Sequence, residues 1–219
     1  MNRVFLISPA NCNGERAQWV LKKTARSDLA RRLRSPEGAP LGEVFSFLSA
    51  LYFRGKLAYA QAFARPPSNA AAILIITPTA GLLPHDTMIR LSTLRGFSRV
   101  PISLKNRRYR YSLLRAVKKL AAEVGPDCEV VLLGSIASAK YTEILIPAFR
   151  EQLRVPTEFI GLGDMSRGAL LLRHVKENRE LDYISVGSLC APALRRLKPS
   201  QSINTTVIPT LIKPSNTLR

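Results

Sequence analysis

The sequence predicts an α/β fold with a mainly parallel central sheet and helices on both of its faces. Strand-like runs alternate along the chain with segments of helical periodicity, which is typical of strands joined by crossover helices. Runs such as residues 73–76 are continuously apolar, as expected for strands that are covered on both faces. A chain of 219 residues that is 46% hydrophobic is long enough to bury one core of this kind.

Each element follows from its local pattern. We expect a single α/β domain over residues 1–189, followed by a basic, Pro/Ser/Thr-rich tail over residues 190–219. The stretch 70–86 predicts a buried central strand that runs into a Pro/Gly turn and then a helix starting near Pro84 or Asp86. We expect strands at 3–8, 72–77, 129–133, 157–160 and 182–186. We expect helices that start at about residue 15 and that span 29–34, 43–64, 109–124, 139–153 and 165–178, with a break at Gly55 in the third of them.

The charge of the chain is its most unusual property. The formal net charge is +18 and the isoelectric point is near 10.7. An excess of this size favours an anionic partner, either nucleic acid or an acidic membrane surface. A basic protein without such a partner is the alternative.

The number and spacing of cysteines and histidines argue against a disulfide-rich protein and against a zinc site. Three widely spaced cysteines, Cys12, Cys128 and Cys190, fit reduced thiols in a cytoplasmic protein better than a disulfide framework. With only His85 and His174 besides, no zinc spacing is present, and we expect neither a metal nor a cofactor. The uncharged stretch 66–84 contains four prolines, which argues against a membrane span.

One basic segment carries the strongest functional signal. No acidic residue lies between Asp86 and Glu123, whereas ten basic residues do. Arginine binds phosphate bidentately, and tyrosine stacks on unpaired bases. Contacts to the phosphate backbone carry no base information, so sequence-specific recognition is not implied. The residues expected to bind nucleic acid are Arg95, Arg99, Lys105, Arg107, Arg108, Tyr109, Arg110 and Arg115.

The turns that follow the strands form a second candidate site. Turns at 8–14, 77–84, 134–138 and 161–166 are expected to open at the same edge of the sheet, where α/β folds bind ligands. Small residues there allow close approach to a nucleotide or an extruded base. Ordinary turn chemistry, with Asn13 as a helix cap, is the alternative. The residues of this expected nucleotide or anion pocket are Asn11, Asn13, Thr77, Gly81, Gly134, Ser135, Lys140 and Arg167.

Groups for acid–base catalysis are sparse. His85, Asp86 and Asp164 are the candidates, and Glu143 lies near another turn. A helix-capping role for Asp86 is the alternative to a catalytic one. No Walker loop, GxGxxG spacing or nucleophile elbow is present, so the sequence does not establish whether the protein is an enzyme.

Two stretches resemble a known pattern. Residues 5–10 and 75–84, with Val100-Pro101-Ile102 downstream, resemble the uracil-DNA-glycosylase-like accessory domain of archaeosine synthases, and residues 51–60 resemble a related bacterial family of unknown function. The resemblance covers about residues 3–160. It implies a three-layer α/β sandwich, Rossmann-like or uracil-DNA-glycosylase-like, associated with nucleic-acid modification. Members of the bacterial family carry Cys and Lys after the first strand, where this chain has residues 9–13, so no catalytic residue is transferred.

These observations lead to one hypothesis and two alternatives. We expect a nucleic-acid-binding protein, with DNA or RNA as its partner, that contacts the phosphate backbone and holds a nucleotide or base at the sheet edge. The first alternative is a nucleotide or base-glycosidic-bond hydrolase. The second is a basic subunit of a protein or nucleoprotein complex. A nucleic-acid-binding protein should lose affinity steeply as salt increases. A hydrolase should lose turnover when Asp86 or Asp164 is replaced by Asn. A subunit should bind nothing tightly as an isolated chain.

Overall fold

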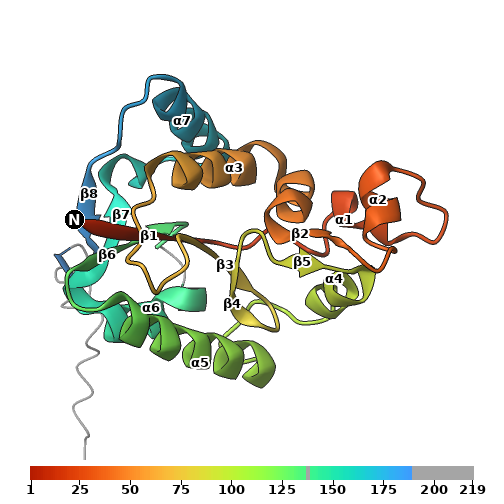
Figure 1. Ribbon diagram of the computed structural model, residues 1–219, viewed down its shortest axis with the longest axis horizontal. Helices are drawn as coiled ribbons and strands as arrows, with labels where there is room; N and C mark the ends of the chain where they lie inside the picture. The colour runs from red at the N-terminus through yellow and green to blue at the C-terminus, as the bar shows by residue number, and fades with distance from the viewer. Residues whose placement is uncertain (137–138, 189–219) are drawn as a thin grey trace, which may run out of the picture.

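The computed structural model describes residues 1–136 and 139–188. Its main sheet has six strands in the order β4-β3-β1-β6-β7-β8 (Figure 1). The inner four, β3 (Ile73–Thr77), β1 (Asn2–Ile7), β6 (Cys128–Leu133) and β7 (Leu153–Pro156), are parallel. Antiparallel strands β4 (Gly81–Pro84) and β8 (Tyr183–Ser185) close the two edges. The predicted α/β fold class is confirmed.

Helices cover both faces of the sheet and make a three-layer sandwich. Helices α3 (Leu41–Phe63) and α7 (Asp164–Lys176) lie on one face, and α5 (Arg107–Val124) and α6 (Ala139–Phe149) lie on the other (Figure 1). Alternate residues of β1 point into the two layers: Phe5 and Ile7 join the core under α3, whereas Val4 and Leu6 join the core under α5. This two-sided burial explains why the strands are continuously apolar.

Smaller elements build one end of the molecule and the connections. Helices α1 (Glu15–Leu21), α2 (Asp28–Arg32) and α4 (Leu91–Ser98) gather beyond the carboxyl end of the sheet with the two-stranded β2 (Ala39–Pro40) and β5 (Met88–Ile89) (Figure 1). Ser27 caps α2 by accepting a hydrogen bond from the Ala30 amide. Two 3₁₀ turns, Arg150–Gln152 and Thr157–Phe159, flank β7.

Several local predictions are wrong around the second strand. Strand β3 is not central, because it lies between β4 and β1, and the turn after it closes a β-hairpin instead of leading to a helix. Neither Pro84 nor Asp86 starts a helix: Pro84 ends β4, and Asp86 lies in the turn before β5. Strand β4 has only four residues, begins at a glycine and ends at a proline, and such a run is too short for periodicity to distinguish it from a turn.

Two other boundaries also differ from the prediction. The fourth parallel strand is Leu153–Pro156 rather than 157–160, because α6 ends at Phe149, shortly after Pro147. The bend in α3 is at Ala50, whose φ of 49° and ψ of −127° are not helical, and not at Gly55. Gly55 instead allows α3 to approach α7, since a Cβ there would lie 2.7 Å from the Gly168 carbonyl oxygen. The expected C-terminal tail lies outside the described residues.

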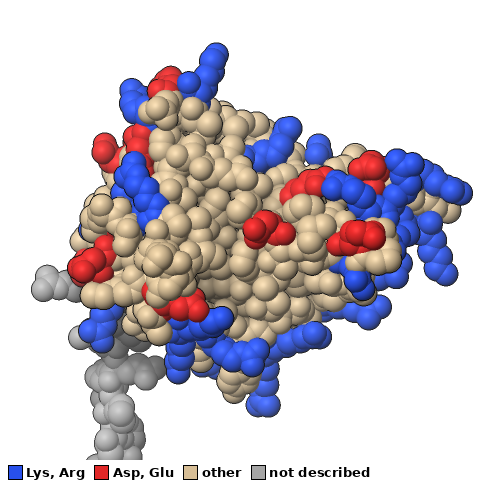
Figure 2. All heavy atoms as spheres, viewed as in Figure 1, with Lys and Arg blue, Asp and Glu red and all other residues tan. Residues whose placement is uncertain are grey.

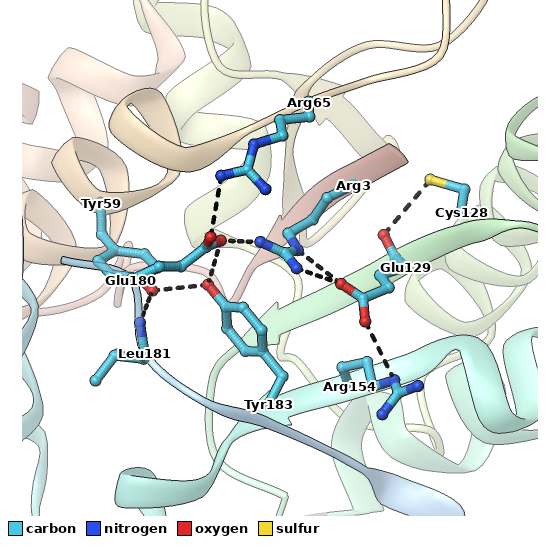
Figure 3. Close-up of polar contacts among 9 residues, drawn as sticks. All are labelled: Arg3, Tyr59, Arg65, Cys128, Glu129, Arg154, Glu180, Leu181 and Tyr183. Carbon is cyan, nitrogen blue, oxygen red and sulfur yellow. Dashed lines mark hydrogen bonds and ion pairs between the residues drawn. The ribbon is translucent and has the colours of Figure 1, made fainter. Parts of the chain in front are cut away.

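A buried ion-pair network joins the amino ends of the parallel strands (Figure 3). The Arg3 guanidinium lies between the carboxylates of Glu129 and Glu180 and pairs with both. Tyr183 donates a hydrogen bond to Glu180 at 3.2 Å, and its hydroxyl lies 2.7 Å from that of Tyr59. Each buried charge is thus paired, which identifies this end of the sheet as a structural centre.

Candidate functional site

A cavity of about 550 Å³ opens at the carboxyl ends of β1, β3 and β6. The chain leaves β1 toward β3 on one side and later returns to β6 on the other, so the loops that follow β1 and β6 diverge there. All four predicted turns contribute to its wall, through residues 8–11 and Asn13, Pro78, Ser135 and Asp164. The prediction that these turns meet at one sheet edge is therefore correct.

Lys56 forms the inner wall of this cavity. It belongs to the buried face of α3, in the same stripe as Tyr52, Tyr59 and Phe63, and only 1% of it is exposed. Its Nζ atom donates hydrogen bonds to the Ser8 carbonyl oxygen at 2.9 Å and to Ser8 Oγ at 2.8 Å. The Nζ atom also lies 4.4 Å from the centre of the Tyr52 ring. Within the described residues, Lys56 forms no ion pair with a carboxylate.

The surroundings of Lys56 disfavour its charged form. Burial lowers the pKa of Lys56 to about 7, although the negative charge of Asp164 opposes this shift. Arg167 adds repulsion and lowers the pKa further. A buried amine without a partnering carboxylate is costly to the fold, and amines of this kind concentrate at functional sites.

Two tyrosine hydroxyls complete the polar lining. Burial raises the pKa of Tyr141, whose hydroxyl interacts with the Ser8 side chain and the Ser135 backbone. Gly134 makes this approach possible, since a Cβ there would lie 2.8 Å from Ser8 Cβ and 3.0 Å from the Tyr141 hydroxyl. Burial raises the pKa of Tyr52 to about 12, and Arg167 opposes the shift without reaching hydrogen-bonding geometry to the hydroxyl. The buried Tyr52 hydroxyl therefore has no partner among the described residues.

The structure brings together half of the predicted anion pocket. Asn11, Asn13, Ser135 and Lys140 line the cavity. Asn13 does not cap α1, because the capping position is Gly14, and the Asn11 side chain instead accepts a hydrogen bond from the Asn13 amide at 2.9 Å. The remaining predicted residues serve the fold and lie outside the lining: Thr77 and Gly81 in the β3–β4 hairpin, Gly134 behind Ser8, and Arg167 on the Phe159 carbonyl.

Only one of the candidate acid–base groups reaches the cavity. Asp164, at the start of α7, lines it, with its side chain 71% exposed and 3.6 Å from Arg167. His85 and Asp86 lie in the turn before β5 and are not part of the lining. Glu143 lines a neighbouring hollow with Lys105 and Arg110. That hollow shares Ile102 and Lys140 with the cavity, so the two are continuous along the surface.

The basic segment forms the exposed face of α5 and the loops before it. Figure 2 shows Lys and Arg side chains along the edge of the molecule that α5 occupies in Figure 1. A second hollow on α5 lies between Arg107, Arg108, Arg115 and Lys118. None of these four forms an ion pair with any described carboxylate, and no carboxylate lines the hollow. Arg95 and Arg99 are exposed on α4 and at its end, and Lys105 and Arg110 are exposed near the start of α5.

One predicted nucleic-acid contact is wrong. Tyr109 is fully buried, and its hydroxyl donates a hydrogen bond to the Lys140 carbonyl oxygen at 2.9 Å, so its ring cannot stack on a base. Tyr111, two residues later, lies on the opposite side of the helix and is 61% exposed within the basic hollow. Tyrosines two residues apart in a helix lie on nearly opposite sides of it, and Leu113 and Val117 place Tyr109 on the buried face.

Sequence reasoning missed Ser8 and Lys56 as a pair. The signal for Lys56 was present: it is the only charged residue in the stripe of Tyr52, Tyr59 and Phe63, spaced as one face of a helix. The signal for Ser8 was its place as the first polar residue after the apolar run of residues 4–7. Their contact across 48 residues, however, depends on how α3 packs on the sheet.

Comparison with known proteins adds no assignment to this geometry. No protein-family model matches the chain, and neither the curated proteins nor the solved structures include a significant match.

Within the described residues, no group of His, Cys, Asp and Glu side chains is arranged to hold a metal ion. No described helix is long and apolar enough to cross a membrane. Cys12 is buried, which raises the pKa of its thiol to about 12.

Proposed function

We propose that this protein binds nucleic acid through the α5 surface and holds one nucleotide or base in the cavity beside it. The α5 surface comprises Lys105, Arg107, Arg108, Arg110, Tyr111, Arg115 and Lys118. The observation that carries the proposal is the cluster of arginines on α5 that no described carboxylate neutralises. Such a surface attracts a polyanion and releases counterions on binding.

The position of the cavity supports the second half of the proposal. The hollow lined by Lys105 and Arg110 joins the cavity through Lys140, so a strand bound to the α5 surface passes its mouth. A volume of about 550 Å³ is in the range of small-molecule sites. Asn11 and Asn13 offer amide groups for a base edge, and the exposed Tyr111 ring offers a stacking surface outside it. The resemblance to a glycosylase-like domain of nucleic-acid modification points in the same direction.

The first test measures the binding of labelled single- and double-stranded DNA and RNA across a salt series. We expect a steep loss of affinity with salt, and a slope that falls by about two in Arg107→Glu/Arg108→Glu. Lys22→Glu/Lys23→Glu is the matched control, since it changes the net charge equally at the end of α1, which packs against the core under α3 and not against the core under α5. If both variants weaken binding equally, the loss of affinity comes from the change in net charge and not from the α5 surface. Absence of binding at low salt would reject the proposal and favour a protein partner.

A second test addresses the cavity. Nucleoside monophosphates are titrated into the protein by calorimetry, and Lys140→Met is compared with the wild-type chain. We expect the dissociation constant to rise about tenfold, as for loss of a charged hydrogen bond to phosphate. An unchanged dissociation constant would place the nucleotide elsewhere.

The alternative of a glycosidic-bond hydrolase depends on one residue. Asp164 is the only one of the three candidate acid–base groups in the cavity. If the alternative holds, Asp164→Asn abolishes release of a base from the bound strand while leaving affinity within about twofold.

A further inference from the structure

We propose that Ser8 is a nucleophile and Lys56 its general base, and that together they hydrolyse carboxylic esters in the cavity. The two side chains meet at the carboxyl end of β1, where Lys56 Nζ lies 2.8 Å from Ser8 Oγ. This separation is the hydrogen-bond distance required of a nucleophile and its base. Lysine replaces histidine as the base in one variant of the serine-hydrolase arrangement. The proposal does not require nucleic-acid binding.

The placement of the two groups suits these roles. Ser8 lines the cavity and is 8% exposed, whereas Lys56 lies behind it and is 1% exposed. A substrate therefore meets the hydroxyl while the amine stays out of water. The Ser8 carbonyl oxygen accepts a second hydrogen bond from Nζ at 2.9 Å, which fixes the amine against the residue that it would activate.

The charges around Lys56 favour the neutral amine that a base needs. The groups that face the pair are Tyr52 from α3, Tyr141 from α6, and Asp164 and Arg167 from α7. Asp164 is mostly exposed and already close to Arg167, so it does not hold Lys56 charged. With its pKa lowered to about 7, Lys56 loses its proton near neutrality.

Other groups supply what ester hydrolysis further requires. The backbone N–H groups of Ala10 and Asn11, two lining residues, form no hydrogen bond within the described chain and are available donors for an oxyanion. The Tyr52 hydroxyl is a further unpartnered donor in the lining. Val100, Pro101 and Ile102 give one wall an apolar character suited to an acyl chain.

The reaction balances with water as the only co-reactant. The Ser8 oxygen forms a bond to the ester carbonyl carbon while its proton passes to Lys56. The bond from that carbon to the alcohol oxygen then breaks, and Lys56 returns the proton to the departing alcohol, which leaves an acyl-serine. Water attacks the acyl carbon and gives a proton to Lys56. The carboxylic acid departs as the Ser8 oxygen regains that proton.

The test uses a fluorophosphonate probe, which labels activated serines covalently, together with 4-nitrophenyl acetate turnover. We expect labelling of the wild-type chain at Ser8, identified by mass spectrometry of the labelled peptide. The rate should rise with pH through about 7 as Lys56 loses its proton. Ser8→Ala should abolish labelling, whereas Ser49→Ala, which removes another hydroxyl of the same cavity lining, should leave it unchanged. Lys56→Met should slow it at least about 100-fold.

Folding is checked by circular dichroism and chemical unfolding, and nucleic-acid binding is measured on the same preparations. No labelling of Ser8 between about pH 6 and 9 in folded wild-type protein would overturn the proposal, as would equal labelling of Ser8→Ala. Labelling without nucleic-acid binding would reject the proposed function and keep the dyad. Nucleic-acid binding without labelling of Ser8 would reject the dyad and keep the proposed function.

Discussion

Replacing Lys56 by methionine isolates the energetic cost of one buried amine. Methionine has a similar length and no charge, so the change removes the ammonium with little change in volume. The variant also loses the hydrogen bonds to Ser8, which contributes a term that does not depend on pH. The pH dependence of the free energy of unfolding therefore reports on the charge alone.

The sign and the size of the effect follow from the pKa of Lys56. Its value is about 7 in the folded chain and is expected near 10.5 in the unfolded chain, so the unfolded chain binds an additional proton between these values. The contribution of Lys56 to stability therefore rises with pH across this window, and it is most unfavourable below about pH 7. Between about pH 7 and about pH 8.5 the gain is about 1.5 kcal/mol, out of a full range of about 5 kcal/mol.

The assay is urea unfolding of the wild-type and Lys56→Met chains at a series of pH values. We expect their difference in the free energy of unfolding to shift by about 1.5 kcal/mol in favour of the wild type over this interval. Cys12 works in the opposite direction above its usual pKa of 9.0, because its folded-state pKa is raised, but both chains contain it and its contribution cancels.

Lys22→Met is the matched control, since Lys22 is exposed and lies outside the cavity. Its stability should follow the wild-type curve across the same interval. Parallel curves for the wild type and Lys56→Met would refute the reasoning, because they would mean that the ammonium is as well solvated in the folded chain as in the unfolded one.

Three further predictions test the packing, the ion-pair network and the α5 surface. Gly168→Ala should lower the free energy of unfolding by about 1–3 kcal/mol, since its Cβ would lie 2.9 Å from the Tyr52 Cα, whereas Gly96→Ala in α4 meets no atom within 4 Å and should be neutral or slightly stabilising; thermal unfolding checks both. Glu129→Gln leaves the buried Arg3 without one of its two carboxylates and should cost about 3 kcal/mol in urea unfolding, against at most about 1 kcal/mol for Glu123→Gln in an exposed pair; similar costs would contradict a buried network. Tyr111→Ala should weaken single-stranded nucleic-acid binding by about 1–3 kcal/mol, with stability changed by no more than about 0.5 kcal/mol; unchanged affinity in a fluorescence anisotropy titration would exclude stacking.

Charged and polar side chains are arranged differently at the two ends of the sheet. At the amino ends of the strands, Arg3 is paired with Glu129 and Glu180, and neighbouring hydroxyl groups are hydrogen-bonded to one another (Figure 3). At the carboxyl ends, Lys56 has no carboxylate partner and the Tyr52 hydroxyl has no partner among the described residues. The first arrangement satisfies its buried charges within the fold, and the second leaves groups available for a ligand in the cavity.

The sequence by itself determined the fold class and the strongest helix. Continuous apolar runs such as 130–133 identify strands buried on both faces, and the spacing of Leu113, Val117 and Leu120 identifies α5 up to its glycine cap. The absence of acids from residues 87–122 also located the basic surface. These signals are local, because each depends on residues within one or two turns or one strand.

Only the tertiary structure decided which side chains meet at the cavity. Periodicity places Lys56 on the buried face of α3, yet its contact with Ser8 requires α3 to pack across the end of β1, and Tyr141 reaches the same place from α6. Tyr109, by contrast, shares the buried stripe of α5 with Leu113 and Val117, so helical periodicity is sufficient to place it inward and Tyr111 outward. Contacts between residues far apart in the chain depend on strand order and helix packing, which a pattern of local preferences does not encode.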